Sequence, residues 1–163
     1  MDVPGAARLT DEPALAEALR AAGLRVTRPR LLVLGFLREA GGHRSVEEIR
    51  AALGTRGVAL PRASVYNVVT DLARGRLAMV TDVGPGRALY ESSQRWHHHF
   101  VCRTCGAIAD VPCVVGRRPC LTAGARVGEV EEAQVTFRGR CQACLLKAPR
   151  RPRRPRPARK PRA

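Results

Sequence analysis

Histidine and cysteine are concentrated in one short stretch of the chain. Three of the four histidines and two of the six cysteines lie between His97 and Cys105, and a second Cys-x-x-Cys pair occupies Cys141 and Cys144. Two such pairs can supply the four sulfur ligands of a tetrahedral Zn²⁺. Because the N-terminus lacks the features of a signal peptide, we expect a cytoplasmic protein with zinc-bound thiolates rather than disulfides. A redox dithiol and buried apolar cysteines are the alternatives.

The three consecutive histidines alternate between two faces if this segment is a strand. Side chains at positions i and i+2 of a strand share a face, so His97 and His99 point one way and His98 the other. Next to Cys102, the His97 and His99 pair favours metal binding over a solvent-facing polar strand end. His98 is left out of that site.

Charge indicates the kind of partner. The 163 residues carry a net charge of +15, and nine Lys or Arg without an acid lie from Lys147 to Ala163, so residues 1–146 keep +6. This balance favours a nucleic-acid partner. The basic, proline-containing tail, residues 147–163, is expected to be disordered and to add salt-dependent, nonspecific affinity. No run is long enough for a membrane span.

Capping and breaker residues divide the first half of the chain into four predicted helices. Ser45 and Glu48 form a capping box at the start of the third helix, and Pro61 begins the fourth. Thr27 is the expected cap of the second. In chain order the helices span residues 10–23, 27–40, 45–54 and 61–72.

A β-hairpin is predicted next, from residues 77–83 and 87–91 around Gly84-Pro85-Gly86. Helices followed by a hairpin are typical of a winged helix-turn-helix domain, in which the fourth helix reads DNA and the hairpin is the wing. An ordinary solvated helix face is the alternative. The expected DNA contacts are Arg25, Arg28, Arg62, Ser64, Tyr66, Asn67 and Arg87, with Arg30 as a further basic flank.

The rest of the chain predicts strands. Residues 100–102 and 107–111 flank a zinc-knuckle turn, and residues 134–138 lead into the second cysteine pair. Between them, residues 120–123 are the start of a weakly marked helix. The predicted class is α+β, with a winged-helix domain over residues 1–90 and a metal-binding domain over residues 91–146.

Taken in order, these motifs resemble the ferric uptake regulator (Fur) family of bacterial metal-dependent repressors. The resemblance covers about residues 24–144. It rests on Gly-Leu-Arg-Val-Thr-Arg-Pro-Arg from Gly23, the helix start from His43 to Ile49, Ser64-Val65-Tyr66, and His97-x-His99-x-x-Cys102-x-x-Cys105-Gly106 with Cys141-x-x-Cys144. The segment Asp110-Val111-x-Cys113-x-x-Gly116-x-x-Pro119-Cys120-Leu121 resembles a cysteine pair typical of the branch that controls catalase-peroxidase genes.

The resemblance implies a homodimer with a C-terminal α/β dimerisation domain, a double-stranded DNA operator and two metal sites. The structural Zn²⁺ would be held by Cys102, Cys105, Cys141 and Cys144. The regulatory ion maps onto His43, Glu91, His97, His99 and Asp110. This nitrogen and oxygen set suits Fe²⁺ or Mn²⁺, with Zn²⁺ and Ni²⁺ as further candidates.

The expected function is a repressor that responds to peroxide or iron and releases its operator on metal loss or oxidation. Cys113 and Cys120 leave three interpretations open: half-buried small residues, a redox pair or metal ligands. The alternatives are an iron, zinc or nickel uptake regulator without peroxide sensing and, from another class, a zinc-ribbon redox protein. No grouping of nucleophile, base and orienting residue predicts an enzyme.

Overall fold

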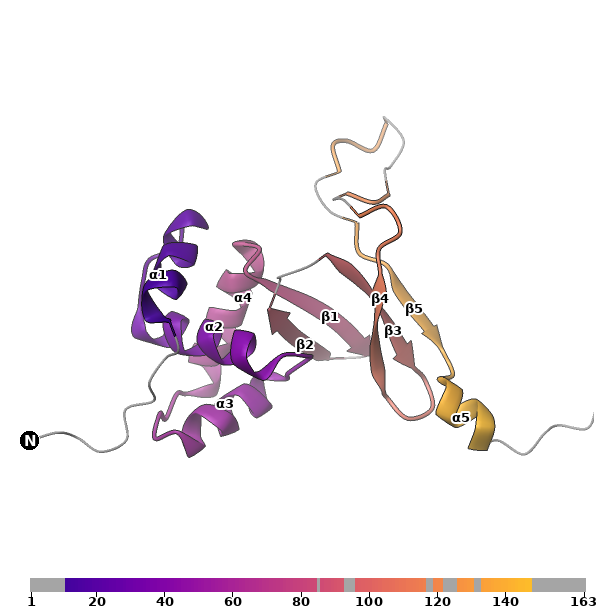
Figure 1. The fold of residues 1–163 in the computed structure, drawn as a ribbon, viewed down its shortest axis with the longest axis horizontal. Coiled ribbons are helices and arrows are strands. Elements are labelled where there is room, and N and C mark those ends of the chain that lie inside the picture. Colours follow the sequence, from indigo (N-terminus) through magenta and orange to yellow (C-terminus); the bar gives the residue numbers. More distant parts are fainter. Residues whose placement is uncertain are drawn as a thin grey trace, which may run out of the picture.

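Four helices form one end of the molecule, a two-stranded hairpin lies in the middle, and a three-stranded sheet with a short helix forms the other end (Figure 1). The computed structural model describes residues 11–84, 86–92, 96–116, 119–121, 126–130 and 133–147. The α+β class is confirmed. None of the helices in this described part is long and apolar enough to cross a membrane.

Ten elements make up the described chain. The helices are α1 (Glu12–Ala21), α2 (Arg28–Ala40), α3 (Val46–Thr55), α4 (Arg62–Arg74) and α5 (Gln142–Lys147). The strands are β1 (Ala78–Gly84), β2 (Arg87–Ser92), β3 (His97–Cys102), β4 (Ile108–Pro112) and β5 (Thr136–Gly139).

The hydrophobic core lies among the first four helices. Apolar side chains recur three or four residues apart on each helix, which gives each an apolar stripe facing its neighbours. The most deeply buried are Leu19 of α1, Val33, Leu34 and Leu37 of α2, Ile49 and Leu53 of α3, and Val65, Val69 and Leu72 of α4. The hairpin joins this core through Ala78 and Tyr90.

The predicted helix starts are confirmed, with one difference in capping. Ser45 accepts a hydrogen bond from the Glu48 amide at 3.2 Å, and the Glu48 carboxylate accepts one from the Ser45 amide at 2.7 Å, which completes the capping box. Thr27 stands at the cap position of α2, but its side chain makes no capping hydrogen bond, so that detail was wrong. The fixed φ of Pro29 supports this helix start without it.

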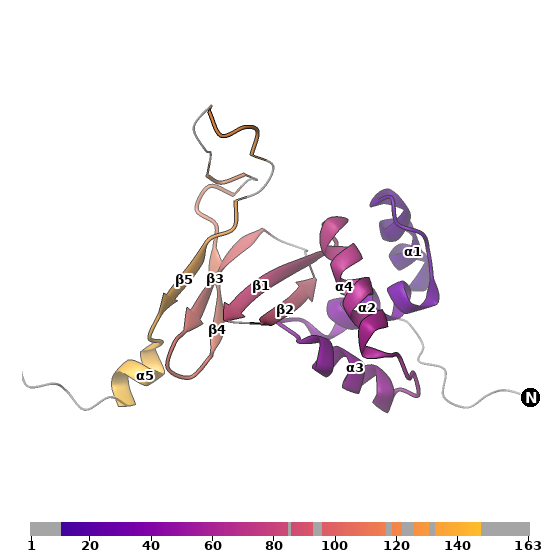
Figure 2. The ribbon, with the colours of Figure 1, turned by 180° about the vertical axis from the view of Figure 1, so that it is seen from behind.

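Two sheets follow the helices (Figure 2). β1 and β2 pair in antiparallel fashion, with an irregular register between Asp82 and Gly84. In the second sheet, β3 is the middle strand, antiparallel to β4 and parallel to β5. β3 therefore carries the three histidines through the centre of this sheet.

The second half of the chain differs from the prediction in two places. α5 was not predicted, because a six-residue helix that starts beside a cysteine has too few positions to show a helical period. Of the expected helix at residues 120–123, Cys120 and Leu121 form a bend, and residues 122–123 lie outside the described residues. The basic tail beyond Lys147 also lies outside them.

Candidate metal centres and nucleic-acid interface

The four cysteines predicted to hold zinc meet at the far end of the second sheet. Cys102 ends β3, and Cys105 follows it in a turn. The parallel register pairs Cys102 with Gly139, so the chain leaving β5 places Cys141 beside Cys102. The Arg103 amide donates to the Gly139 carbonyl at 2.7 Å and holds this turn against β5. The pairing of β3 with β5 thus joins two cysteine pairs that are far apart in sequence.

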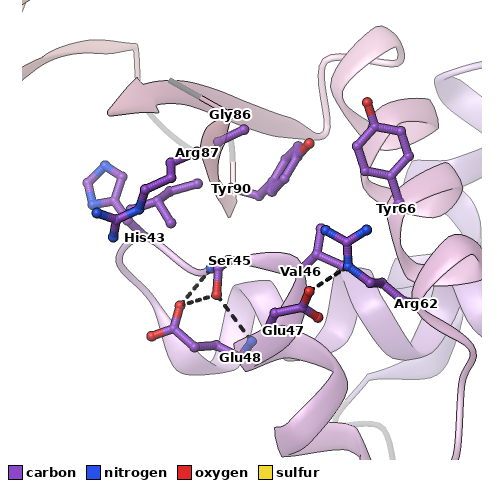
Figure 3. Close-up of a pocket in the computed structure, with 12 residues that line it drawn as sticks. His43, Ser45, Val46, Glu47, Glu48, Arg62, Tyr66, Gly86, Arg87 and Tyr90 are labelled. Atoms are coloured by element: carbon purple, nitrogen blue, oxygen red, sulfur yellow. Dashed lines mark hydrogen bonds and ion pairs between the residues drawn. The ribbon is translucent and has the colours of Figure 1, made fainter. Parts of the chain in front are cut away.

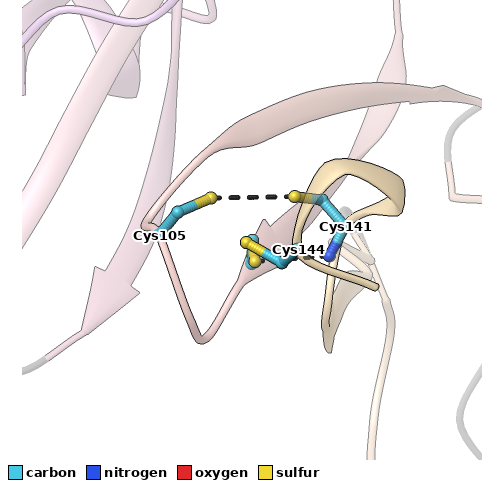
Figure 4. Close-up of side chains that lie close together, drawn as sticks. Cys105, Cys141 and Cys144 are labelled. Carbon is cyan, nitrogen blue, oxygen red and sulfur yellow. Dashed lines mark hydrogen bonds between the residues drawn. The ribbon is translucent and has the colours of Figure 1, made fainter. Parts of the chain in front are cut away.

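The sulfur atoms of these residues, the cysteine cluster, fit a tetrahedral ion. One ligand atom from each of Cys102, Cys105, Cys141 and Cys144 lies within 4.8 Å of the others. The Cys105 and Cys141 sulfurs are 3.7 Å apart (Figure 4). Sulfurs bound to zinc at about 2.3 Å stand about 3.8 Å from each other in a tetrahedron. The cluster therefore has the spacing that Zn²⁺ requires.

Backbone amides prepare one of these sulfurs to be a thiolate. The amides of Cys141 and Cys105 lower the pKa of Cys102 to about 5, and the Cys141 amide lies 3.3 Å from its sulfur. Hydrogen bonds to Cys105 and Cys141 raise the pKa of Cys144 to about 12. Cys102 and Cys144 thus hold their protons unequally, as expected when one negative charge is shared in a small cluster.

A single β-bridge brings the helical end of the molecule to the second cluster. The Arg44 amide donates to the Tyr90 carbonyl at 2.8 Å, and the Tyr90 amide donates back to the Arg44 carbonyl at 2.8 Å. Antiparallel pairing of residue 44 with residue 90 places His43 opposite Glu91. Because His43 lies between α2 and α3, this bridge fixes it next to the hairpin.

The sheet supplies the remaining donors of this second cluster. His97 and His99 lie on one face of β3, and the register of β3 with β4 places Asp110 directly opposite His99. The five-ligand cluster, in which every ligand atom lies within 4.8 Å of the others, consists of His43, Glu91, His97, His99 and Asp110.

Three imidazoles face one carboxylate oxygen in the five-ligand cluster. The Nε2 atoms of His99, His97 and His43 lie 2.7, 3.1 and 3.3 Å from Glu91 Oε1. Asp110 Oδ1 lies 3.6 Å from both His43 and His97. Nitrogen and oxygen ligands at about 2.1 Å from a metal stand about 3 Å apart when they occupy adjacent octahedral positions. The donor types and their spacing therefore fit a divalent cation.

The charges in this cluster are strongly coupled. Burial alone would raise the pKa of Glu91, but the His43 and His99 hydrogen bonds and the charges of His43 and His97 outweigh it and lower the pKa to about 2. The hydrogen bond to Glu91 raises the pKa of His43. Glu91 is thus an anion at neutral pH, and it is buried.

Thr81 is a further part of this cluster that the sequence reasoning missed. Its hydroxyl lies 3.0 Å from His99 Nδ1, on the opposite side of the ring from Glu91. Thr81 is buried in β1. A second partner of this kind fixes the orientation of a ligand histidine. The available signal was a hydroxyl residue directly after the apolar run Ala78-Met79-Val80, since buried hydroxyls need a partner.

His98 does not join the five-ligand cluster. It lies on the other face of β3, as the alternation predicts, with Nε2 3.4 Å from Cys120 Sγ. Burial lowers the pKa of His98, and the neighbouring histidine charges lower it further. His98, Cys113 and Cys120 form a third group of donors.

Three of the predicted DNA contacts line one cavity. Arg62 and Tyr66 of α4 and Arg87 of β2 border a cavity of about 480 Å³ that also reaches His43 and the start of α3 (Figure 3). Tyr66 is 52% exposed, and Arg87 is also exposed. Of the other predicted contacts, Asn67 is exposed and Ser64 half-buried on α4, and Arg25 and Arg28 are exposed near the start of α2.

Two of the basic residues already have acidic partners. Arg62 forms an ion pair with Glu47 of α3 (Figure 3), so a DNA phosphate would have to replace that carboxylate. Arg30 pairs with Asp71 at 2.7 Å and links α2 to α4. This ion pair gives Arg30 a structural role, and its expected place in the basic DNA flank stays a prediction.

Comparison with known proteins agrees with this arrangement. A model of the ferric uptake regulator family matches residues 21–115. The transcriptional regulator FurA of Mycobacterium tuberculosis is 42% identical over 136 residues, which cover 82% of this chain and 92% of that protein.

Two solved structures resemble the fold. The ferric uptake regulator of Pseudomonas aeruginosa with manganese has a TM-score of 0.65 at 28% identity, over 78% of this chain and 98% of that one. The Vibrio cholerae ferric uptake regulator, described with a rearrangement of its DNA-binding domains, has a TM-score of 0.59 at 29% identity. The match covers 77% of this chain and 98% of that one.

Proposed function

The chain belongs to the ferric uptake regulator family, and on that premise we propose that it is a metal-dependent repressor of transcription. It binds its DNA operator when a divalent ion, Fe²⁺ in the cell, is held by the five-ligand cluster. It releases the operator when that ion is lost or the site is oxidised.

The single observation that carries this proposal is the origin of the five ligands. His43 comes from the connection between α2 and α3, Glu91 from the hairpin, and the other three from the second sheet. All five ligands can reach the same ion only when the helices take one position relative to that sheet. Ion binding thus selects one arrangement of the DNA-reading helix.

The side chains of the cluster change partners when the ion leaves. A bound divalent ion supplies the positive charge that the Glu91 and Asp110 carboxylates share. Without it, the Glu91 carboxylate keeps only its contacts with the three imidazoles, and Asp110, which is exposed, faces His43 and His97 only at 3.6 Å. The link from the sheet to His43 is therefore weaker, and the α2–α3 connection gains freedom to move.

The cysteine cluster has a separate, permanent role in this proposal. Its four thiolates hold Zn²⁺ and stabilise the sheet through which two copies of the chain associate. We assign the sheet-bearing part, residues 91–146, to homodimerisation and the part before it to DNA. The DNA contacts are the exposed side chains that border the cavity, Arg62, Tyr66 and Arg87, with Arg25, Arg28, Ser64 and Asn67 as flanking contacts.

Peroxide is the signal we propose beyond iron itself. If iron occupies the five-ligand cluster, the imidazoles of His97 and His99 would be the groups open to oxidation by peroxide, and the thiols of Cys113 and Cys120 offer a second oxidisable pair. The alternative is a regulator of iron, zinc or nickel uptake that does not sense peroxide. Family membership argues against the zinc-ribbon redox protein.

One series of measurements tests the proposal. Duplexes selected from a random DNA pool by the Mn²⁺-loaded protein define the operator. Its affinity is then measured by fluorescence anisotropy with Fe²⁺, Mn²⁺, Zn²⁺ and Ni²⁺, each before and after peroxide. We expect binding only with metal, and loss of binding after peroxide only in the iron form.

The results distinguish a peroxide-responsive repressor from an uptake regulator that does not sense peroxide. Metal-independent operator binding would contradict the repressor model. Metal-dependent binding that survives peroxide in the iron form supports the uptake regulator instead. Mass spectrometry of the oxidised protein separates an oxygen atom added to His97 or His99 from a disulfide between Cys113 and Cys120.

A further inference from the structure

A buried histidine lies on the face of β3 that the five-ligand cluster does not use. His98 is 8% exposed, and its Nε2 atom points at the Cys120 sulfur at 3.4 Å. Its other nitrogen, Nδ1, is buried and has no hydrogen-bond partner among the described residues. Burying an imidazole is costly unless its nitrogens have partners, and the sulfur atoms near Nε2 are the partners that the structure offers to that nitrogen.

The strand register accounts for the first of these sulfurs. His98 pairs with Val111 across β3 and β4, so every second residue from Val111 shares the His98 face. Cys113 is the next such residue, directly after β4 ends at Pro112. Cys120 comes from the chain beyond, where its sulfur also lies 3.5 Å from the Ala133 carbonyl.

These three side chains bring together one nitrogen and two sulfurs. One ligand atom from each of His98, Cys113 and Cys120 lies within 4.8 Å of the others. A nitrogen and a sulfur bound to the same tetrahedral zinc, at about 2.0 and 2.3 Å, stand about 3.5 Å apart. The observed 3.4 Å between His98 Nε2 and Cys120 Sγ matches that spacing.

We propose that His98, Cys113 and Cys120 form a third metal site, which binds Zn²⁺ through two thiolates and one imidazole. The softness of this donor set distinguishes it from the five-ligand cluster. Thiolates favour Zn²⁺ or Cu(I), whereas the carboxylates and imidazoles on the other face also suit Fe²⁺ and Mn²⁺. The described residues supply no fourth protein ligand here, so the fourth position is open to water.

A redox pair is the competing interpretation of the two cysteines. A disulfide between Cys113 and Cys120 would remove the thiol that faces His98 Nε2, and the buried imidazole would then lose the contact made by that nitrogen. A bound Zn²⁺, in contrast, would be coordinated by all three side chains. The position of His98 therefore favours the metal site.

Occupancy of this site would tie the segment after β4 to the centre of the sheet. His98 stands between two ligands of the five-ligand cluster, so both faces of β3 would be held by metal ions. The third site does not rest on the regulatory proposal, since zinc can bind there whether or not the chain senses iron or peroxide.

The test counts zinc in the reduced full-length protein. After zinc loading and removal of loosely held metal by gel filtration, elemental analysis compares the wild type with a Cys113→Ser/Cys120→Ser variant. We expect the variant to hold one zinc per chain fewer. Val114→Ser is the matched control, because Val114 is adjacent and fully exposed, and it should keep the wild-type count.

Cobalt provides a second readout of the ligands themselves. The Co²⁺-loaded wild type should lose part of its thiolate-to-cobalt absorption in the double cysteine variant, and His98→Gln should shift the visible bands. If the buried His98 variant does not fold, the cysteine variant alone decides, and its circular dichroism verifies that it is folded.

Two results would overturn the third site. Equal zinc counts in the wild type and the double cysteine variant would exclude it. Equal counts together with a Cys113–Cys120 disulfide after peroxide, detected by mass spectrometry, would identify a thiol switch in its place. DNA affinity measured on the same samples tests the regulatory proposal separately.

Discussion

The cysteine cluster and the five-ligand cluster share strand β3 but differ in what they connect. The cysteine cluster draws its donors from β3 with its turn and from α5 with the residue before it, all at one end of one sheet. The five-ligand cluster joins that sheet to the hairpin and, through one backbone bridge, to the helices. A metal ion that closes one structural unit stabilises it, whereas a metal ion that spans two units sets their relative placement. The two sites thus illustrate how ligand origin, as much as ligand type, separates a structural ion from a regulatory one.

The largest effect is expected from breaking the cysteine cluster. Cys102→Ser removes a buried sulfur, and we expect loss of the bound zinc and destabilisation of the second sheet by more than about 4 kcal/mol. Elemental analysis and thermal unfolding measure both. Thr104→Ser, in the same turn, should keep zinc and stability. One tightly held zinc remaining in Cys102→Ser would contradict the assignment.

Removing a ligand from the five-ligand cluster should weaken the binding of metal and of DNA without destabilising the fold. For His97→Ala we expect the affinity for the regulatory metal to fall by at least about 100-fold, with loss of metal-dependent operator binding. The zinc of the cysteine cluster and the unfolding temperature should change little. Ala109→Ser, at an exposed position of β4 next to Asp110, is the comparison and should keep both the metal and the operator binding. Metal-dependent DNA binding that persists in His97→Ala would show that the site is misassigned.

A smaller effect on metal affinity is expected from Thr81, which contacts the ligand His99. Thr81→Val keeps the shape of the side chain but removes the hydroxyl 3.0 Å from His99 Nδ1. We expect the affinity of the five-ligand cluster to fall by about tenfold, measured by competition with a metal-sensitive dye. Thr70→Val on α4, where the hydroxyl donates to the Tyr66 carbonyl, should leave that affinity unchanged.

The smallest effect concerns pH in protein that lacks the regulatory ion. The pKa of Glu91 falls from 4.5 to about 2, so its stabilising contribution is present above pH 4.5 and is lost as the pH falls towards 2. The pKa of His43 is raised above 6.5, so its contribution is full below pH 6.5 and is lost as the pH rises through the higher value.

Stability without the regulatory ion should therefore be greatest between pH 4.5 and 6.5. We expect the unfolding temperature to drop by about 2–4 °C between pH 6 and 8. Glu91→Gln should reduce this dependence, since it removes the carboxylate whose hydrogen bond and charge raise the pKa of His43. An unfolding temperature that rises over this interval would contradict the coupling.

Sequence reasoning succeeded where local signals act alone. The capping box at Ser45, the proline at Pro61 and the glycines around the hairpin turn each act within a few residues, and the corresponding elements are present. The alternation that separates His98 from its neighbours is equally local. Grouping His43 and Glu91 with the sheet ligands came from family resemblance, and their role as ligands stays a prediction.

What the sequence could not provide were contacts between distant segments. The parallel pairing of β3 with β5, the Thr81 contact to His99 and the approach of Cys120 to His98 each depend on tertiary packing. No periodicity marks such contacts. They are also the contacts that turn separate donors into three distinct clusters.

The parallel pairing of β3 with β5 has a consequence for how the chain is made. Cys141 follows Cys102 by 39 residues, so it leaves the ribosome about 2–8 s later at synthesis rates of about 5–20 residues per second. During that interval α1 to α4 and the hairpin have been synthesised, but the thiols of Cys102 and Cys105 have no partners yet. Zinc capture is then one of the last steps of assembly, and only a chain synthesised as far as Cys144 has all four thiols that close the site.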